Sequence, residues 1–125
     1  MTLHERLKTI IKDAVPRGTT VAEVFLPFDA KTSAYRTTTP AAIFRIEEME
    51  DRAFGMYRTN VRVDLLGKTT DVESMYKLIC KAFSQQVNNG EWSISLAAGS
   101  IRETWDFDLN VDWGTMTLRG IVIEQ

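Results

Sequence analysis

The sequence predicts one α+β domain spanning residues 1–125, with two layers: two helices on one face of a mostly antiparallel sheet of about five to six strands. Three observations favour this class. Apolar residues recur at helical spacing in an N-terminal and a central segment. Residues 57–65 alternate between an apolar and a polar face, and three further alternating segments fill the last third of the chain.

The first helix is predicted over residues 2–14. Thr2 and Glu5 have the spacing of a capping box, in which each residue's side chain accepts a hydrogen bond from the backbone N–H of the other. His4, the only histidine, is expected on the helix surface. Pro16 and Gly18 end the helix, and its apolar stripe consists of Leu3, Leu7, Ile10, Ile11 and Ala14.

Residues 20–26 favour a strand that ends at Pro27, and residues 28–40 follow without a clear period. A structureless connection of this length is uncommon in a compact domain unless it binds a partner or is disordered. Tyr35 and Arg36, near its middle, are residue types enriched at protein interfaces. The segment is therefore either a mobile surface loop or a contact segment, and a short strand at residues 37–39 stays open.

Residues 41–48 and 57–65 are predicted to form an antiparallel pair joined by a turn at residues 52–55. Side chains alternate across a strand, so one face of the second strand is expected to be buried and the other solvated. The expected buried face carries Tyr57, Thr59, Val61, Val63 and Leu65, and the expected solvated face carries Arg58, Asn60, Arg62 and Asp64.

The second helix is predicted to begin at Thr70, which has Glu73 at the capping-box distance, and to stop at the Asn88–Gly90 run. Cys80 lies beside its apolar stripe and is expected to be a small buried or half-buried thiol. The stripe consists of Val72, Met75, Tyr76, Ile79, Ala82 and Phe83.

The last third is predicted to hold strands at residues 92–98, 101–111 and 113–124, with a chain reversal at Gly99–Ser100 and a bulge near Gly120. An enzyme that uses the carboxylates of Asp106, Asp108 and Asp112 stays open as an alternative function. A calcium loop fits this region less well than a strand does, because aromatic residues alternate with the acids and no glycine stands at the sharp-turn position.

Composition and the missing motifs disfavour several classes of function. The net charge of −2 gives no overall attraction to nucleic acid or to an anionic membrane, so neither is expected as a partner. No apolar run approaches the roughly 18 residues that span a bilayer, and the single cysteine cannot form an internal disulfide, so a cytoplasmic site of synthesis is expected. The sequence lacks a phosphate loop, zinc spacing and a nucleophile elbow. We therefore expect no catalytic residue, metal or cofactor, and no enzymatic activity.

Three features resemble the tail terminator and tail-completion proteins of long-tailed bacteriophages and prophages. An N-terminal helix, LHERLKTIIKDAVP, leads into strands. The strand R-x-x-V-R-V-D-L-L-G, from Arg58 to Gly67, is followed at once by the helix V-E-S-M-Y-K-L-I-C-K-A-F. An acidic, aromatic strand then leads to the closing strand W-G-T-M-T-L-R-G-I-V-I-E, so the resemblance covers nearly the whole chain.

The resemblance implies a non-enzymatic virion subunit, assembled in the bacterial host cytoplasm, that forms a ring, commonly a hexamer, at the head-proximal end of the tail tube. Such a ring stops tail polymerisation and joins the tail to the head. Its expected partners are copies of itself, the tail tube protein and a head-completion or connector protein. The candidate contact residues are Tyr35, Arg36, Arg58, Asn60 and Arg62.

Two alternatives stay open beside this expectation. Arg58 and Arg62 also suit a sheet face that only contacts solvent. A monomeric cytoplasmic adaptor domain that binds a protein or RNA could use the same bare face, although an RNA-binding sheet usually presents exposed aromatic residues, and none lies between these two arginines.

Overall fold

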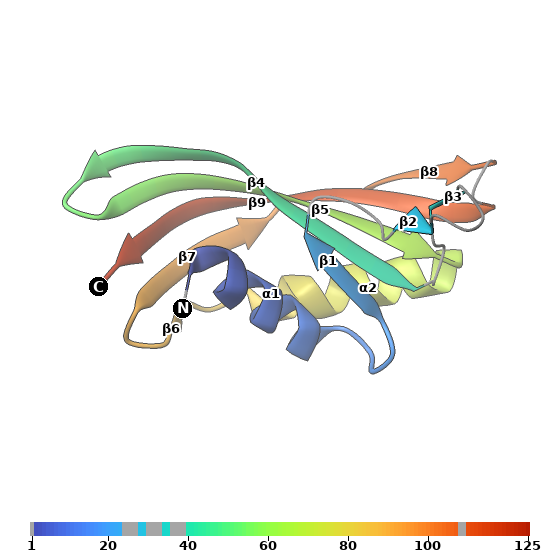
Figure 1. Ribbon diagram of the computed structural model, residues 1–125, viewed down its shortest axis with the longest axis horizontal. Helices are drawn as coiled ribbons and strands as arrows, with labels where there is room; N and C mark the ends of the chain where they lie inside the picture. The colour runs from blue at the N-terminus through green and yellow to red at the C-terminus, as the bar shows by residue number, and fades with distance from the viewer. Residues whose placement is uncertain (1, 24–27, 30–33, 36–39, 108–109) are drawn as a thin grey trace.

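The computed structural model describes residues 2–23, 28–29, 34–35, 40–107 and 110–125. Two helices and a mixed, strongly curled sheet make up the fold, which confirms the α+β class (Figure 1). In chain order the elements are α1 (Leu3–Ala14), β1 (Thr20–Glu23), β2 (Phe28–Asp29), β3 (Ala34–Tyr35), β4 (Ala41–Ala53), β5 (Met56–Gly67), α2 (Thr69–Ala82), β6 (Val87–Asn88), β7 (Trp92–Ala98), β8 (Arg102–Asp106) and β9 (Val111–Glu124).

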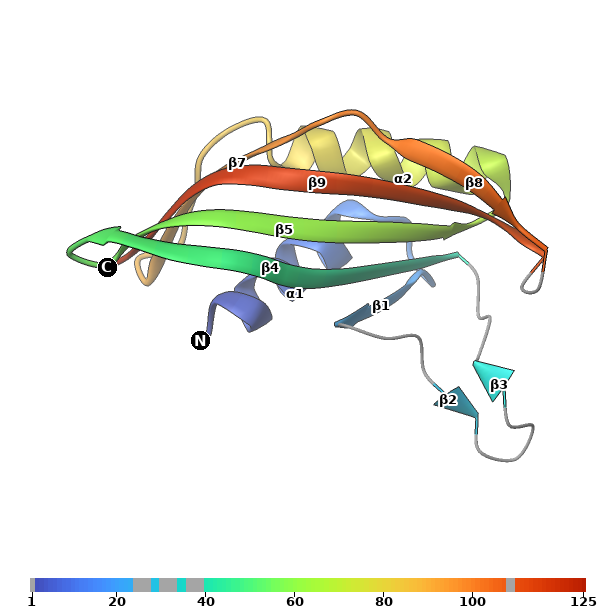
Figure 2. The same ribbon diagram turned by 90° about the horizontal axis from the view of Figure 1, so that it is seen from above.

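The sheet is larger than the five to six strands expected. Seven strands take part: six follow the order β1-β4-β5-β9-β7-β6, and β8 also pairs with β9. β1 runs parallel to β4, and the other pairs are antiparallel. β2 and β3 form a separate two-stranded ribbon, which Figure 2 shows set apart from the large sheet.

Both helices lie on the same side of the sheet, which we call its inner face; the opposite side is the outer face (Figures 1 and 2). The predicted alternation of β5 is confirmed, because Val61, Val63 and Leu65 are fully buried on the inner face. Burial of each such side chain contributes roughly 1.5–3 kcal/mol to folding. The helices contribute Leu3, Leu7, Ile10, Ile11, Val72, Met75 and Ile79 to the same core.

The start of α1 is confirmed, and the start of α2 was placed wrongly. Thr2 Oγ1 accepts a hydrogen bond from the Glu5 N–H at 3.1 Å, which is one of the two hydrogen bonds of a capping box. In α2 the cap is Lys68, whose backbone N–H donates to Asp71 Oδ2 at 3.3 Å. Asp71, three residues after Lys68, thus satisfies the backbone N–H of Lys68, and the helix begins before Thr70.

The Asn88–Gly90 run ends a strand rather than a helix. α2 already stops at Ala82, and the run forms the turn between β6 and β7. Asn88 Oδ1 accepts from the Gly90 N–H at 2.9 Å, and Asn89 Oδ1 accepts from the Trp92 N–H at 2.8 Å. Asparagine side chains favour such turns as readily as helix ends, so the sequence signal was ambiguous.

The chain does not reverse at Gly99–Ser100. β7 and β8 both pair antiparallel with β9, so they run in the same direction. Arg102 lies four positions after Ala98, whereas their partners on β9, Thr115 and Leu118, are only three positions apart. The segment that joins β7 to β8 therefore contains one extra residue. The bulge therefore lies here and not at Gly120.

The predicted strand over residues 101–111 is two strands. β8 ends at Asp106, and the chain turns before β9 begins at Val111. Asn110 has a positive φ of 56°, a conformation that asparagine tolerates better than most residues. The turn between β4 and β5 is likewise shorter than predicted, because β4 continues to Ala53 and only Phe54 and Gly55 connect the strands.

Gly120 is needed for close packing of strands. Its pairing with Thr59 and Leu96 shows no register shift, so the predicted bulge is absent. A Cβ atom at this position would lie 2.0 Å from the Ser95 carbonyl oxygen, well inside van der Waals contact. Only glycine therefore lets β7 approach β9 here.

Gly120→Ala is expected to lower the free energy of unfolding by about 1–3 kcal/mol or more, because the backbone of β7 must move to admit the methyl group. Urea denaturation monitored by circular dichroism measures this change. Gly99→Ala is the matched control, since the nearest atom to its added Cβ is the Thr117 carbonyl oxygen at 3.9 Å. Equal losses in the two variants would contradict the packing argument.

Candidate interaction surfaces

The structure brings together three of the five predicted contact residues. Arg58, Asn60 and Arg62 lie on the outer face of β5, as the alternation predicted. Tyr35 belongs to β3, where it pairs with Phe28 of β2. Arg36 lies outside the described residues, as does the possible strand at residues 37–39.

Asn60 and Arg62 are held by neighbours on the same face. Asn60 Nδ2 donates to Glu48 Oε2 at 3.1 Å across the β4–β5 pair. Arg62 Nε donates to Asp64 Oδ1 at 3.1 Å, and the same oxygen accepts from Thr115 Oγ1 at 2.9 Å. These two residues therefore already serve a polar network within the domain.

Three exposed arginines on the strands have no such partner among the described residues. Within the described part of the chain, Arg58, Arg102 and Arg119 make no ion pair. Arg119 pairs with Asn60 across β5 and β9, so it joins the predicted residues on the outer face. The alternation of Thr115, Thr117 and Arg119 with buried residues of β9 could have identified it, but the sequence reasoning missed it.

Two shallow hollows lie beside these arginines. One, of about 550 Å³, is lined by Arg58, Asn60, Arg119, Gly120 and Ile121. The other, of about 500 Å³, lies where β7 passes into β8 and is lined by Ala97, Ala98, Gly99, Ser100, Arg102, Thr115, Thr117 and Arg119. Arg119 lines both, so it is the central cation of this part of the outer face.

The other end of the outer face is apolar. Leu66 follows the inward-facing Leu65 on β5, so its side chain points away from the helices. It is nevertheless fully buried. It packs in a second cluster with Ala41, Ile43, Val111 and Trp113. The outer face therefore has a closed apolar end and an open polar end that carries the arginines.

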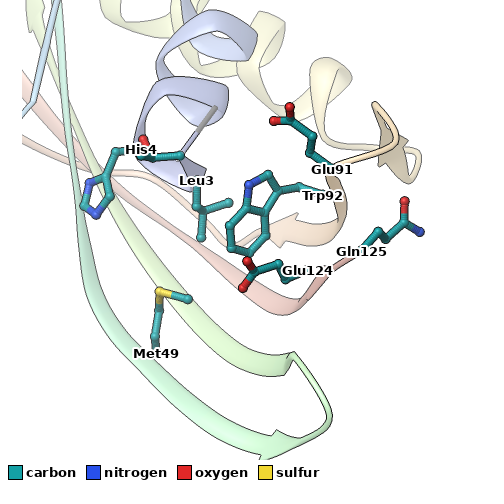
Figure 3. A pocket seen from close by; sticks show the side chains of 8 residues that line it. Leu3, His4, Met49, Glu91, Trp92, Glu124 and Gln125 are labelled. Atoms are coloured by element: carbon teal, nitrogen blue, oxygen red, sulfur yellow. The ribbon is translucent and has the colours of Figure 1, made fainter.

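A third hollow, which we call the inner-face pocket, opens on the helix side of the sheet (Figure 3). Its volume is about 470 Å³. Leu3 from the start of α1 and Trp92 from β7 point toward each other across it, and Met49 of β4 closes another side. The remaining lining residues are Thr2, His4, Glu91, Glu124 and Gln125, and His4 Nδ1 contacts the Glu23 carboxylate.

Large apolar side chains are exposed at both ends of the sheet. Phe54, at the tip of the β4–β5 hairpin, is fully exposed at 103%, and Met49 and Met56 of the same hairpin are each 38% exposed. We call residues 49–56 the arm, because this part of the hairpin extends past the helices (Figure 1). At the opposite end, Phe107 and Trp105 are 87% and 44% exposed.

The chain matches no protein-family model and no curated protein. Among the described residues, no group of three or more His, Cys, Asp and Glu side chains could hold a metal ion. In the same residues, no helix is both long and apolar enough to cross a membrane. The surfaces above and the sequence resemblance are therefore the basis on which a function can be proposed.

The acids of the last third do not form one cluster. Asp106 and Asp112 leave their strands on opposite faces, because Asp112 pairs with Trp105 rather than with Asp106, and Asp108 lies outside the described residues. Asp112 instead faces Glu103. Burial, a hydrogen bond to the Asp112 side chain, and the charges of Asp112 and Glu73 raise the pKa of Glu103 above its usual value.

A raised pKa means that the folded protein binds a proton at Glu103 more tightly than the unfolded chain does. The associated stability is present below the unfolded pKa and is lost as the pH rises through the folded pKa. Glu103→Gln is therefore expected to be more stable than the wild type at pH 7 and no more stable near pH 4. Urea denaturation at the two pH values measures this, with the exposed Asp13→Asn as control. An equal effect at both pH values would contradict the electrostatic cause.

Proposed function

We propose that this chain is a non-enzymatic structural subunit of a long-tailed phage or prophage. In this proposal it forms a ring at the head-proximal end of the tail tube, stops tail polymerisation and joins the tail to the head. The ring contains six copies, as the sequence resemblance implies, and resides in the neck of the virion after assembly in the host cytoplasm. Its partners are its own copies, the tail tube protein and a head-completion or connector protein.

The observation that carries the proposal is the fully exposed Phe54 at the tip of the arm. Phe54 and Gly55 have φ values of 49° and 78°, the geometry of a two-residue turn that asparagine or aspartate followed by glycine forms best. A bulky residue with positive φ is unusual, and a side chain that touches nothing in its own subunit gives no folding benefit in return. A contact with another protein chain explains both facts.

The sheet supports the same conclusion. We propose that the domain acts as two layers: the helices close the inner face, and the outer face stays available for contacts through Arg58 and Arg119, beside the polar network that holds Asn60 and Arg62. A ring requires contacts on different sides of each subunit, because the surface that binds one neighbour differs from the surface that binds the next. The arm and the polar outer face are two such surfaces.

The mass in solution tests the ring directly. Six copies of the 14.2-kDa chain give 6 × 14.2 = 85.2 kDa. Light scattering over a concentration series, with and without magnesium, is expected to show this mass at high concentration. A monomer at every concentration would contradict a self-assembling ring and would favour the monomeric protein- or RNA-binding adaptor domain.

Phe54→Asn separates assembly from folding. Asparagine suits the turn better than phenylalanine, so the free energy of unfolding is expected to stay within about 0.5 kcal/mol of the wild type or to rise. Loss of a buried aromatic contact between subunits is expected to weaken association by at least about tenfold. Light scattering and urea denaturation of the same sample measure both quantities.

Phe107→Asn is the matched control, because Phe107 is also exposed but lies at the other end of the sheet. An unchanged mass for Phe54→Asn at every concentration would show that the arm tip makes no contact in the ring. A similar loss for both variants would show that exposed aromatics in general, and not the arm, drive association.

A further inference from the structure

Two arginines that make no ion pair with the described residues and an acidic pocket lie on opposite faces of the same end of the sheet. Arg119 and Glu124 stand five positions apart on β9, so their side chains leave the strand on opposite faces. Arg119 and the neighbouring Arg58 border the hollow of the outer face, whereas Glu124 and Glu91 line the inner-face pocket. The two surfaces cannot meet within one chain, but they can meet between copies.

The inner-face pocket has the chemistry that an arginine side chain needs. Leu3 and Met49 offer apolar walls to the methylene stem of an arginine (Figure 3). The indole of Trp92 is the aromatic ring that attracts a guanidinium most strongly, and the carboxylates of Glu91 and Glu124 can accept its N–H donors. Among the described residues that line the pocket there is no lysine or arginine.

We propose that Arg119 of one copy inserts into the inner-face pocket of the next copy, with Arg58 beside it facing the acidic rim. The inference rests on the proposed ring and deepens it by naming a contact between subunits. Arg119 and Arg58 make no ion pair within the described part of their own chain, so neither has to break one on association. Charge complementarity between two faces of the same molecule selects a second copy as the occupant.

The contact joins unlike surfaces, outer face to inner face. Such a head-to-tail contact leaves each copy with one free surface of each kind, so further copies add, and a ring forms where the rotation from copy to copy closes. A pairing of identical surfaces would stop at a dimer. The opposite placement of the arginines and the acids therefore fits repeated addition of copies and not a symmetric dimer through this contact.

Charge reversal with rescue tests the proposal. Arg119→Glu and Glu124→Arg are made singly and together in the full chain, and the two single variants are also mixed in equal amounts. Both positions are exposed, so folding is expected to be unaffected, and circular dichroism checks this. Arg17→Glu and Asp13→Arg, also exposed but remote from the pocket lining, are the matched controls.

Each single reversal is expected to weaken association by at least about tenfold in light scattering, because like charges then face each other. The double variant and the mixture are expected to regain the wild-type mass. In the mixture every contact between the two different variants is either wild type on both sides or reversed on both sides, so the two variants are expected to alternate around the ring. The control variants are expected to assemble as the wild type does.

Three results would overturn the inference. Single reversals that assemble like the wild type would show that the two surfaces are not in contact, and the proposed ring would stand without this contact. Single reversals that fail, with no recovery in the mixture or the double variant, would show that each surface binds something other than its counterpart. A wild-type chain that stays monomeric at every concentration would overturn both the ring and the inference.

Discussion

The fold depends on the pairing of β5 with β9. Their register runs from Met56 opposite Ile123 to Gly67 opposite Asp112 without a shift, whereas β4 slips twice against β5. The inner face of this pair carries the fully buried Val61, Val63 and Leu65 of β5, on which the core around both helices is built. A slip of one residue would turn these side chains to the outer face and their arginine neighbours into the core, so this register admits no alternative. The polar outer face is a direct consequence of the same pairing.

Much of the fold could be predicted because it follows from periodicity. The stripes of both helices and the two faces of β5 depend on residue spacing alone, and all were placed correctly. The errors fall where local signals have two meanings. Apolar and polar residues continue to alternate through the β8–β9 turn, so the period could not show where the chain reverses, and Asn110 was the one available sign. Gly120 resembled a bulge, although its small size serves the close approach of Ser95.

The candidate surfaces were predictable only in part. Periodicity placed Arg58, Asn60 and Arg62 on one face, but their partners depend on strand register. The hydrogen bond between Asn60 and Glu48 exists only because β4 bulges after Ile46, which no local pattern indicates. The inner-face pocket collects residues from α1, β4, β7 and β9, and such a meeting of distant segments is a property of the completed fold.

The length of β9 has a further consequence. At about 3.3 Å per residue, its 14 residues span roughly 46 Å, from the turn that carries Phe107 to the end of the sheet. There, the Glu124 N–H donates to the Gly55 carbonyl oxygen at 2.9 Å, beside Phe54. One hydrogen-bonded strand thus connects the two ends of the sheet at which aromatic side chains are exposed. The spacing of any partners held at these two points is set by the path of one strand in the curled sheet, with roughly 46 Å as its upper limit, rather than by the reach of a flexible loop.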